Sequence, residues 1–282
     1  MKIRAILATG LLLTMIQSCS QTSITDQSIK LYVLDCGEIT VKDISLFSPN
    51  VNVGVSKRLA NTCYLIKHPK GNLLWETGLN DNLSTSKNGI SIADGMFHLK
   101  VNSSLVSQLQ AINIACSDID YLALSHFHFD HTGNMNLFLK SKILIQQEEL
   151  TAAFSDKATK MHFDPNTYNR ISKEQFIALN GRYDVFNDES VVIFPAPGHT
   201  PGHQVLQINL KHTGSLILSG DLYHFKENRV NQRVPLVNFD ENSSLKSMVS
   251  IEKQLTETQA KLWIQHDMET FNSLRHSPVF YD

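Results

Sequence analysis

Three histidines and one aspartate crowd into six consecutive positions near the middle of this 282-residue chain. They are His126, His128, Asp130 and His131. Imidazole and carboxylate groups bind divalent metal ions, whereas packing of an apolar core gives no reason to crowd them together. We therefore predict a metal site here, of the kind that activates water and polarises a substrate carbonyl.

Three further candidate ligands lie downstream, and each follows an apolar run that is typical of a β-strand. The runs and their ligands are 191–194 with His199, 216–218 with Asp221, and 262–265 with His266. The cluster 126–131 likewise follows the apolar run 121–124. Because the ends of several strands in one domain can present side chains to a shared rim, we expect one site built from all of them.

Together, the HxHxDH cluster, His199, Asp221 and His266 resemble the metallo-β-lactamase superfamily, over roughly residues 30–270. The resemblance implies a single domain of the α/β (α+β) class, an αββα sandwich, with a dinuclear metal centre. It also implies the ligand roles. The first ion would be held by His126, His128 and His199, the second by Asp130, His131 and His266, and Asp221 would bridge them together with a hydroxide. Zinc is favoured for a nitrogen and oxygen set without thiolates, although iron, manganese or cobalt would also suit it.

Three local stretches are similar to the N-acyl-homoserine lactonases of this superfamily: 93–97, 125–134 and 197–204. This resemblance implies a metal-dependent hydrolase that opens the lactone ring of N-acyl-homoserine lactones and so degrades quorum-sensing signals. The bridging hydroxide would attack the lactone carbonyl. The expected partner is a small lactone with an apolar acyl chain.

Other activities of the superfamily stay open as alternatives. They are an organophosphate triesterase, a glyoxalase II-like thioester hydrolase and a mononuclear-iron persulfide dioxygenase. A glutathione thioester is anionic, and the tail 271–282 offers only Arg275 and His276 to bind it. Metal stoichiometry would distinguish the mononuclear-iron enzyme from a dinuclear hydrolase. A further alternative is a surface-anchored binding protein with an inert metal site, and an activity assay would distinguish it from an enzyme.

Two positions depart from the usual lactonase pattern. A tyrosine is usual three residues after the bridging aspartate, whereas His224 stands there, with Tyr223 beside it. Either could donate a hydrogen bond to the substrate carbonyl, and Asp130 could carry a proton to the leaving alkoxide. The second departure is Glu76, where aspartate is usual; it either supports the ligand loop or is a solvated carboxylate at a strand end.

Apolar side chains near the cluster are candidates for an acyl-chain pocket. Met96, Phe97 and Phe129 are predicted to line it together with His224, since a long acyl tail needs an apolar wall. Core packing is the alternative for these side chains, and equally for Phe127 and Phe138.

The remaining histidines are predicted to be exposed or structural rather than ligands. They are His68, His98, His162, His212 and His276. His203, in the repeated Pro-Gly-His context next to His199, is expected to support the site or the fold without binding metal.

Periodicity predicts the elements that must position these residues. Strands are expected at 31–34, 59–66, 73–76, 191–194, 204–210 and 215–219. Helices are expected at 101–113, 147–154 and 243–258, with a helix-like stretch at 135–140. The polar segment 155–170 is expected to form a long surface excursion near the active site.

The chain has 25 basic and 27 acidic residues, a formal net charge of −2. It therefore has no basic field to bind nucleic acid. No linker divides it, so residues 30–282 are expected to form one metallo-β-lactamase-like domain. The sequence leaves a homodimer open.

The N-terminus resembles an export signal. Lys2 and Arg4 precede the apolar stretch 5–16, and Ser18-Cys19 ends it like a bacterial lipobox. We predict a lipoprotein-type signal at 1–18, a tether at 19–29, and an exported protein of the periplasm or the cell envelope. Membrane contact would come only through the N-terminal lipid. A plain cleaved signal or a buried first helix is the alternative.

Without Cys19, three cysteines remain: Cys36, Cys63 and Cys116. Their odd number and apolar surroundings favour buried thiols over a disulfide framework. One bridge remains open.

Overall fold

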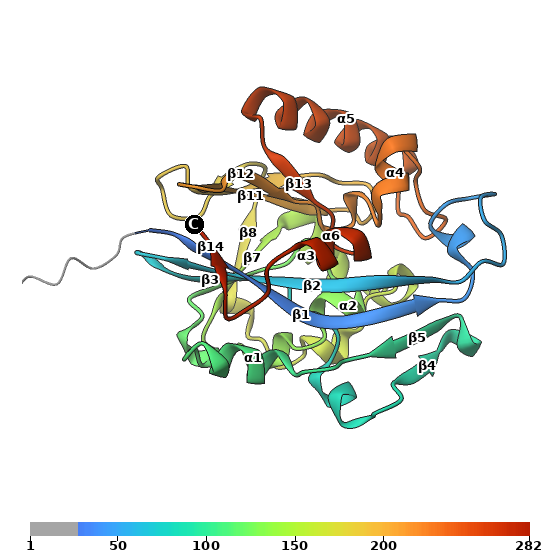
Figure 1. Ribbon diagram of the computed structural model, residues 1–282, viewed down its shortest axis with the longest axis horizontal. Coiled ribbons are helices and arrows are strands. Elements are labelled where there is room, and N and C mark those ends of the chain that lie inside the picture. The colour runs from blue at the N-terminus through green and yellow to red at the C-terminus, as the bar shows by residue number, and fades with distance from the viewer. Residues whose placement is uncertain (1–27) are drawn as a thin grey trace, which may run out of the picture.

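Two β-sheets packed face to face form the centre of residues 28–282, the part of the chain that this computed structural model describes (Figure 1). Helices cover both outer faces, which gives the αββα order predicted from the resemblance. The predicted signal at 1–18 and most of the tether at 19–29 lie outside the described residues.

The first sheet is mixed, and within the described residues it has nine strands. In pairing order eight of them are β4 (Ile90–Ile92), β5 (Phe97–Lys100), β1 (Lys30–Val41), β2 (Lys57–His68), β3 (Gly71–Trp75), β6 (Tyr121–Ala123), β7 (Lys142–Gln146) and β8 (Phe176–Leu179). The ninth, β14 (Phe280–Tyr281), pairs with the start of β1. Strands β3, β6, β7 and β8 run parallel to one another. Their carboxyl ends therefore meet at one edge, where the loop 124–128 begins.

The second sheet is antiparallel except for one edge pair. In order its strands are β13 (Lys261–Trp263), β12 (Gly214–Leu218), β11 (Gln204–Leu210), β10 (Val191–Pro195) and β9 (Tyr183–Asp184). Strand β13 runs parallel to β12. The residues that follow these two strands, Ser219 and Ile264, are therefore at the same end of the sheet.

The helices are mostly short. They are α1 (Leu105–Ala111), α2 (Phe129–Thr132), α3 (Gln147–Ala153), α4 (Lys226–Asn231), α5 (Glu241–Thr258) and α6 (Met268–Ser273). Turns of 3-10 helix are η1 (Ile44–Leu46), η2 (Asp81–Thr85), η3 (Ala93–Gly95), η4 (Cys116–Asp118), η5 (Met135–Leu137), η6 (Ala158–Met161), η7 (Pro165–Thr167), η8 (Lys173–Gln175) and η9 (Gly220–Leu222).

The three predicted helices are present, but α1 is shorter than expected. The helix-like stretch predicted at 135–140 is only the single turn η5. The ligand cluster itself enters α2, which sequence periodicity did not indicate.

Alternation along the strands distributes the apolar side chains among layers. Trp75 and Leu218 pack between the two sheets. Leu74 faces the opposite side, against α1 and α3, and Ile217 faces α5. Since both faces of the central strands are buried, these strands have continuous apolar runs.

The cysteine prediction is wrong for two of the three residues. Cys36 and Cys63 form a disulfide that links β1 to β2. The register shift of β1 between Asp35 and Glu38 lies beside Cys36, at a place where the strand periodicity breaks. Cys116 remains a free thiol and is only partly buried.

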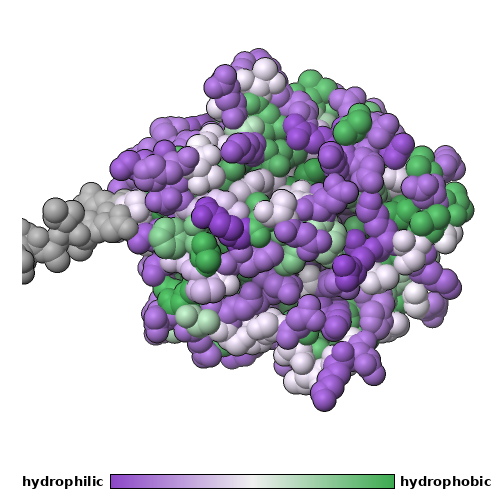
Figure 2. Space-filling model, viewed as in Figure 1, coloured by the Kyte–Doolittle hydropathy of each residue, from purple (hydrophilic) through white to green (hydrophobic). Residues whose placement is uncertain are grey.

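The surface in Figure 2 is mostly hydrophilic, with apolar side chains gathered at the end where the loop 42–56 lies in Figure 1. Val53 and Val55 of this loop are among the exposed apolar residues. Among residues 28–282, we find no helix with the length and hydropathy needed to span a membrane.

Candidate metal centre

All seven predicted ligands meet in one place, in two adjoining groups. The first group is His126, His128, His199 and Asp221, and the second group is Asp130, His131 and His266. Within each group the potential ligand atoms lie within 4.8 Å of one another. None of the seven residues is more than 9% exposed.

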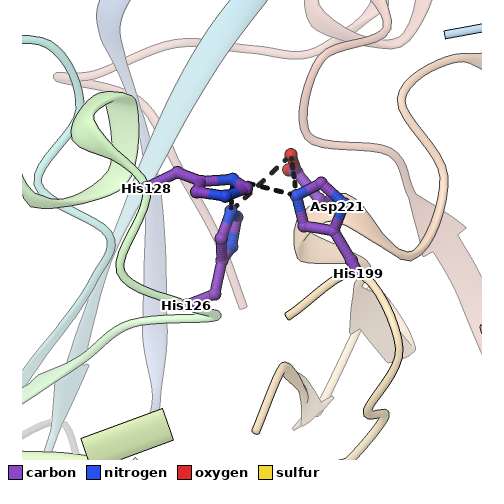
Figure 3. A group of neighbouring side chains, drawn as sticks. All are labelled: His126, His128, His199 and Asp221. Atoms are coloured by element: carbon purple, nitrogen blue, oxygen red, sulfur yellow. Dashed lines mark hydrogen bonds and ion pairs between the residues drawn. The ribbon is translucent and has the colours of Figure 1, made fainter. Parts of the chain in front are cut away.

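In the first group, three imidazoles point their nitrogens at a common centre (Figure 3). His126 Nε2 and His199 Nε2 lie 2.8 and 3.0 Å from His128 Nδ1. His128 donates its other ring proton, on Nε2, to the carbonyl of Met161. His128 Nδ1 therefore carries a lone pair that faces both neighbours. One lone pair cannot satisfy two imidazoles, whereas a cation between the three nitrogens can.

The second group is fixed in the same way. His266 Nδ1 donates to the carbonyl of Ala60 at 2.7 Å. Its Nε2 points at carboxylate oxygens, 3.1 Å from Asp221 Oδ1 and 3.6 Å from Asp130 Oδ2. Burial lowers the pKa of His266, but these carboxylates raise it above the ordinary value. His131 Nε2 and Asp221 Oδ1 are buried without any hydrogen-bond partner. Ring nitrogens that face buried carboxylates favour a positive charge at this place, and a metal ion would supply it, so the donor set fits a metal ion.

Asp221 lies between the two groups. Its Oδ2 is 3.3 Å from His199 Nε2, and its Oδ1 is 3.3 Å from His131 Nε2. The residue sits in η9, where Gly220 has φ +48 and where a Cβ would lie 2.4 Å from Ser125 Cβ. Only glycine allows this close approach. His203 fixes the turn: it accepts the Asp221 N–H at 2.9 Å and donates to the Ala196 carbonyl. The prediction that His203 supports the site is confirmed.

The pKa shifts at the centre follow from burial and charge. Burial, followed by neighbouring histidines, holds the pKa values of His126 and His128 well below the ordinary value, so both are neutral. Burial opposes protonation of His131, but the carboxylates of Asp221 and Glu76 hold its pKa well above the ordinary value. The second group thus attracts positive charge, which a divalent ion would supply.

Glu76 supports the ligand loop, which is one of the two roles predicted for it. It is fully buried and lies at the end of β3 in a left-handed backbone conformation, with φ +69. Its Oε1 accepts the Ser125 N–H at 2.9 Å, and its Oε2 lies 3.2 Å from His131 Nδ1. The solvated alternative is excluded.

These motifs and this fold can be compared with known proteins. The profile of the metallo-beta-lactamase superfamily matches residues 57–260. The chain belongs to the metallo-β-lactamase superfamily.

Relatives in this superfamily match almost the whole chain. An N-acyl homoserine lactonase of Bacillus sp is 29% identical over 257 residues, 89% of this chain and 98% of the relative. The N-acyl homoserine lactonase AttM of Azorhizobium caulinodans is 25% identical, over 90% of this chain and 99% of the relative. A solved N-acyl homoserine lactone hydrolase, with N-hexanoyl-L-homoserine bound at its catalytic metal center, has a TM-score of 0.78 and 26% identity, covering 90% of this chain and 99% of its own. The dizinc lactonase AidC shares the fold, with a TM-score of 0.64, 20% identity and coverage of 90% and 93%.

An apolar cavity of about 530 Å³ opens beside the metal-binding side chains of this superfamily member. The four predicted substrate contacts, Met96, Phe97, Phe129 and His224, all line it. None of the described residues around it is lysine or arginine. The cavity therefore suits a largely apolar ligand and offers no cationic side chain to an anionic one.

The other aromatic candidates belong to the core. Phe127 and Phe138 are fully buried in the layer beneath the first sheet and do not line the cavity. Phe127 and Phe129 therefore face different surroundings, the core and the cavity. The cause is local: Phe129 begins α2, so the strict alternation of an extended loop does not apply.

His224 and Tyr223 point in opposite directions. His224 lines the cavity, with its Nε2 3.1 Å from Asp221 Oδ2 and its ring packed on Phe47. Tyr223 is 1% exposed and donates its hydroxyl to Glu252 of α5. The alternative in which Tyr223 contacts the substrate is therefore corrected, because its side chain packs under α5, away from the cavity.

Sequence reasoning missed several residues of the site. Phe47 and Phe163 line the cavity from loops far apart in the chain. His162, predicted to be exposed or structural, is exposed and also lines it, on the excursion 155–170. Asn61 and Glu149 hold the ligand loops by buried hydrogen bonds. For Glu149 the sequence has no signal, since it follows another glutamate on a helix that could be solvated.

Proposed function

We propose that the chain is a dinuclear-metal-dependent hydrolase that opens the lactone ring of N-acyl-homoserine lactones. One observation carries the proposal: Asp221 lies between two complete ligand groups, beside an apolar cavity whose described lining has no lysine or arginine. The lactonase names of relatives that match nine-tenths of the chain support the same substrate class.

The ligand assignment is part of this proposal. His126, His128 and His199 would hold the first ion, and Asp130, His131 and His266 the second, with Asp221 shared between them. Zinc suits these nitrogen and oxygen donors. When bound, two such ions would polarise the substrate carbonyl and lower the pKa of a shared water molecule.

The chain's own side chains complete the chemistry. Burial lowers the pKa of His224 to about 4, so its ring is neutral near pH 7. Its Nε2 lies 3.1 Å from Asp221 Oδ2; with Asp221 engaged by metal, this N–H would be free to donate to the carbonyl oxygen of a lactone in the cavity, and we assign it that role. The Asp130 carboxylate reaches the cavity with its side chain 12% exposed, and there it can pass a proton to the leaving alkoxide.

The cavity wall would bind the acyl chain and exclude water from the reacting carbonyl. The absence of lysine and arginine among the described lining residues argues against an anionic glutathione thioester. Two complete ligand groups argue against a mononuclear iron enzyme. No contact or charge among the described residues specifically favours a phosphotriester as the substrate.

The test is to offer purified protein, with its metals quantified, a panel of lactones, phosphotriesters and thioesters. We expect about two ions per chain and the highest kcat/KM on N-acyl-homoserine lactones. Faster turnover of a phosphotriester or thioester would contradict the substrate assignment, and one iron per chain would contradict the dinuclear centre.

We also propose that the protein is exported. The Cys36–Cys63 disulfide supports this, because disulfides persist mainly in oxidising compartments such as the periplasm. The lipid anchor and the homodimer remain predictions; light scattering of the purified chain would measure the second.

A further inference from the structure

Glu149 joins the two loops that carry the imidazoles of the first group. It lies in the first turn of α3 and is fully buried. Its Oε1 accepts the N–H of Phe127 at 2.9 Å, and its Oε2 accepts the N–H of Gly202 at 2.8 Å. Phe127 stands between His126 and His128, and Gly202 follows His199 by three residues. One carboxylate therefore ties both loops together.

Helix α3 and the loop that carries His199 are so close at Gly202 that no side chain larger than that of glycine would fit. A Cβ on Gly202 would lie 2.4 Å from the backbone nitrogen of Glu149 and 2.7 Å from its Cβ. Burial raises the pKa of Glu149 to about 7, against the opposing effect of the N–H donors of Gly202 and Phe127. Burying an acid opposes folding, yet here both of its oxygens are used.

The second group depends on other contacts. Asn61 Nδ2 donates to the backbone carbonyl of Asp130 at 2.7 Å, and the carbonyl of Ala60 orients His266. Both belong to β2. Glu76 contacts both Ser125 and His131, whereas the contacts of Glu149 reach only the loops of the first group.

We propose that Glu149 is a positioning residue for the first metal: it sets the affinity of the first group without touching metal or substrate, and leaves the second group unaffected. The inference rests on the ligand assignment proposed above.

The test compares Glu149→Gln with Glu148→Gln in the metal-loaded protein. Glutamine keeps the size of the side chain, but its NH₂ group would face one of the two N–H donors, so one bond is lost. Glu148 is the exposed neighbour on the same helix and serves as the matched control. Ions are removed with increasing chelator, and the remaining metal is counted. In Glu149→Gln we expect one ion to be lost about 10–100-fold more readily and the other to be unchanged, as both are in Glu148→Gln.

Two further backgrounds identify which ion is lost. With His266→Ala the second group is impaired, and the remaining ion should leave readily when Glu149→Gln is added. With His199→Ala the first group is impaired, and adding Glu149→Gln should not change retention of the remaining ion. Melting temperatures of all variants separate loss of metal from loss of fold.

Equal weakening of both ions, or a lowered melting temperature with unchanged metal retention, would overturn the inference. So would the same loss in Glu148→Gln. The lactone panel tests the proposed function separately: two retained ions without lactone hydrolysis would refute the substrate while the metal measurements still decide the role of Glu149. An unaltered chain that binds fewer than two ions would overturn both.

Discussion

The Asp221 carboxylate connects two sets of ligands, each of which takes two residues from the segment 126–131 and one from a later part of the chain. One oxygen faces His199 and the other faces His131 and His266. Burial raises its pKa, but the surrounding histidines, His266 first, hold it well below the ordinary value. The group is therefore ionised at any working pH and always available to metal.

Replacing Asp221 by alanine should remove most activity and lower the metal content below two ions per chain. The reason is that, of the two carboxylates among the seven ligands, only Asp221 lies between both groups. Metal analysis and lactone kinetics on the purified variant measure this, with Asp156→Ala, an exposed aspartate, as control. Two retained ions with near-normal turnover would refute the dinuclear assignment.

The substitution His224→Ala should lower kcat/KM for lactones by about tenfold. The two metals would share the task of stabilising the carbonyl oxygen, so the hydrogen bond from His224 contributes on the order of 1–2 kcal/mol. Tyr223→Phe should leave kcat/KM unchanged and reduce the free energy of unfolding by about 1 kcal/mol, because its hydroxyl bonds only Glu252. Steady-state kinetics, with metal content checked, compares the two. Unchanged kcat/KM in His224→Ala would exclude it as the donor.

At the scale of elements, strand ends deliver the ligands and separate loops build the substrate cavity. The sequence could predict the first feature, because a cluster of histidine and aspartate directly after an apolar run can be recognised within a short stretch of sequence. It could not predict that Phe47, from the loop after β1, meets His224. Such contacts depend on how loops fold in three dimensions, and periodicity carries no information about them.

The same limit explains the disulfide. Cys36 and Cys63 are neighbours only because β1 and β2 pair in antiparallel register, with Leu34 opposite Cys63 and a bulge beside Cys36. An odd count of cysteines in apolar surroundings is equally compatible with free thiols. Glu149 is a further case, since helical periodicity does not distinguish a buried acid from a solvated one.

The segment from η3 to β5 forms one wall of the cavity through Met96 and Phe97. Phe97→Ala should reduce kcat/KM on a decanoyl lactone by roughly tenfold or more, since burial of such a side chain is worth about 1.5–3 kcal/mol. A butanoyl lactone, too short to reach the wall, should lose little. Kinetics across a chain-length series measures this, with Phe154→Ala as control. An equal loss at every chain length would mean that the wall does not bind the acyl chain.

At the scale of the whole molecule, the substrate cavity and the N-terminal start of the domain lie at opposite ends of β1. This strand starts at Lys30, two residues after the described chain begins, and runs 12 residues to the loop that carries Leu46 and Phe47 of the cavity (Figure 1). At about 3.3 Å per residue this is roughly 40 Å. An enzyme anchored by its N-terminus would therefore hold its cavity away from the anchor, open to lactones that diffuse past.

This arrangement gives the export prediction a functional reason. The mature protein should begin at Cys19 and fractionate with membranes in its native host, because a diacylated end supplies a stable anchor. Cys19→Ala should move it to the soluble fraction, whereas Ser20→Ala, which keeps the cysteine, should not. Cell fractionation and the mass of the mature N-terminus measure both. With the cavity far from the anchor, release should leave kcat/KM on soluble lactones unchanged. Recovery of the unaltered protein in the soluble fraction would instead indicate an ordinary cleaved signal.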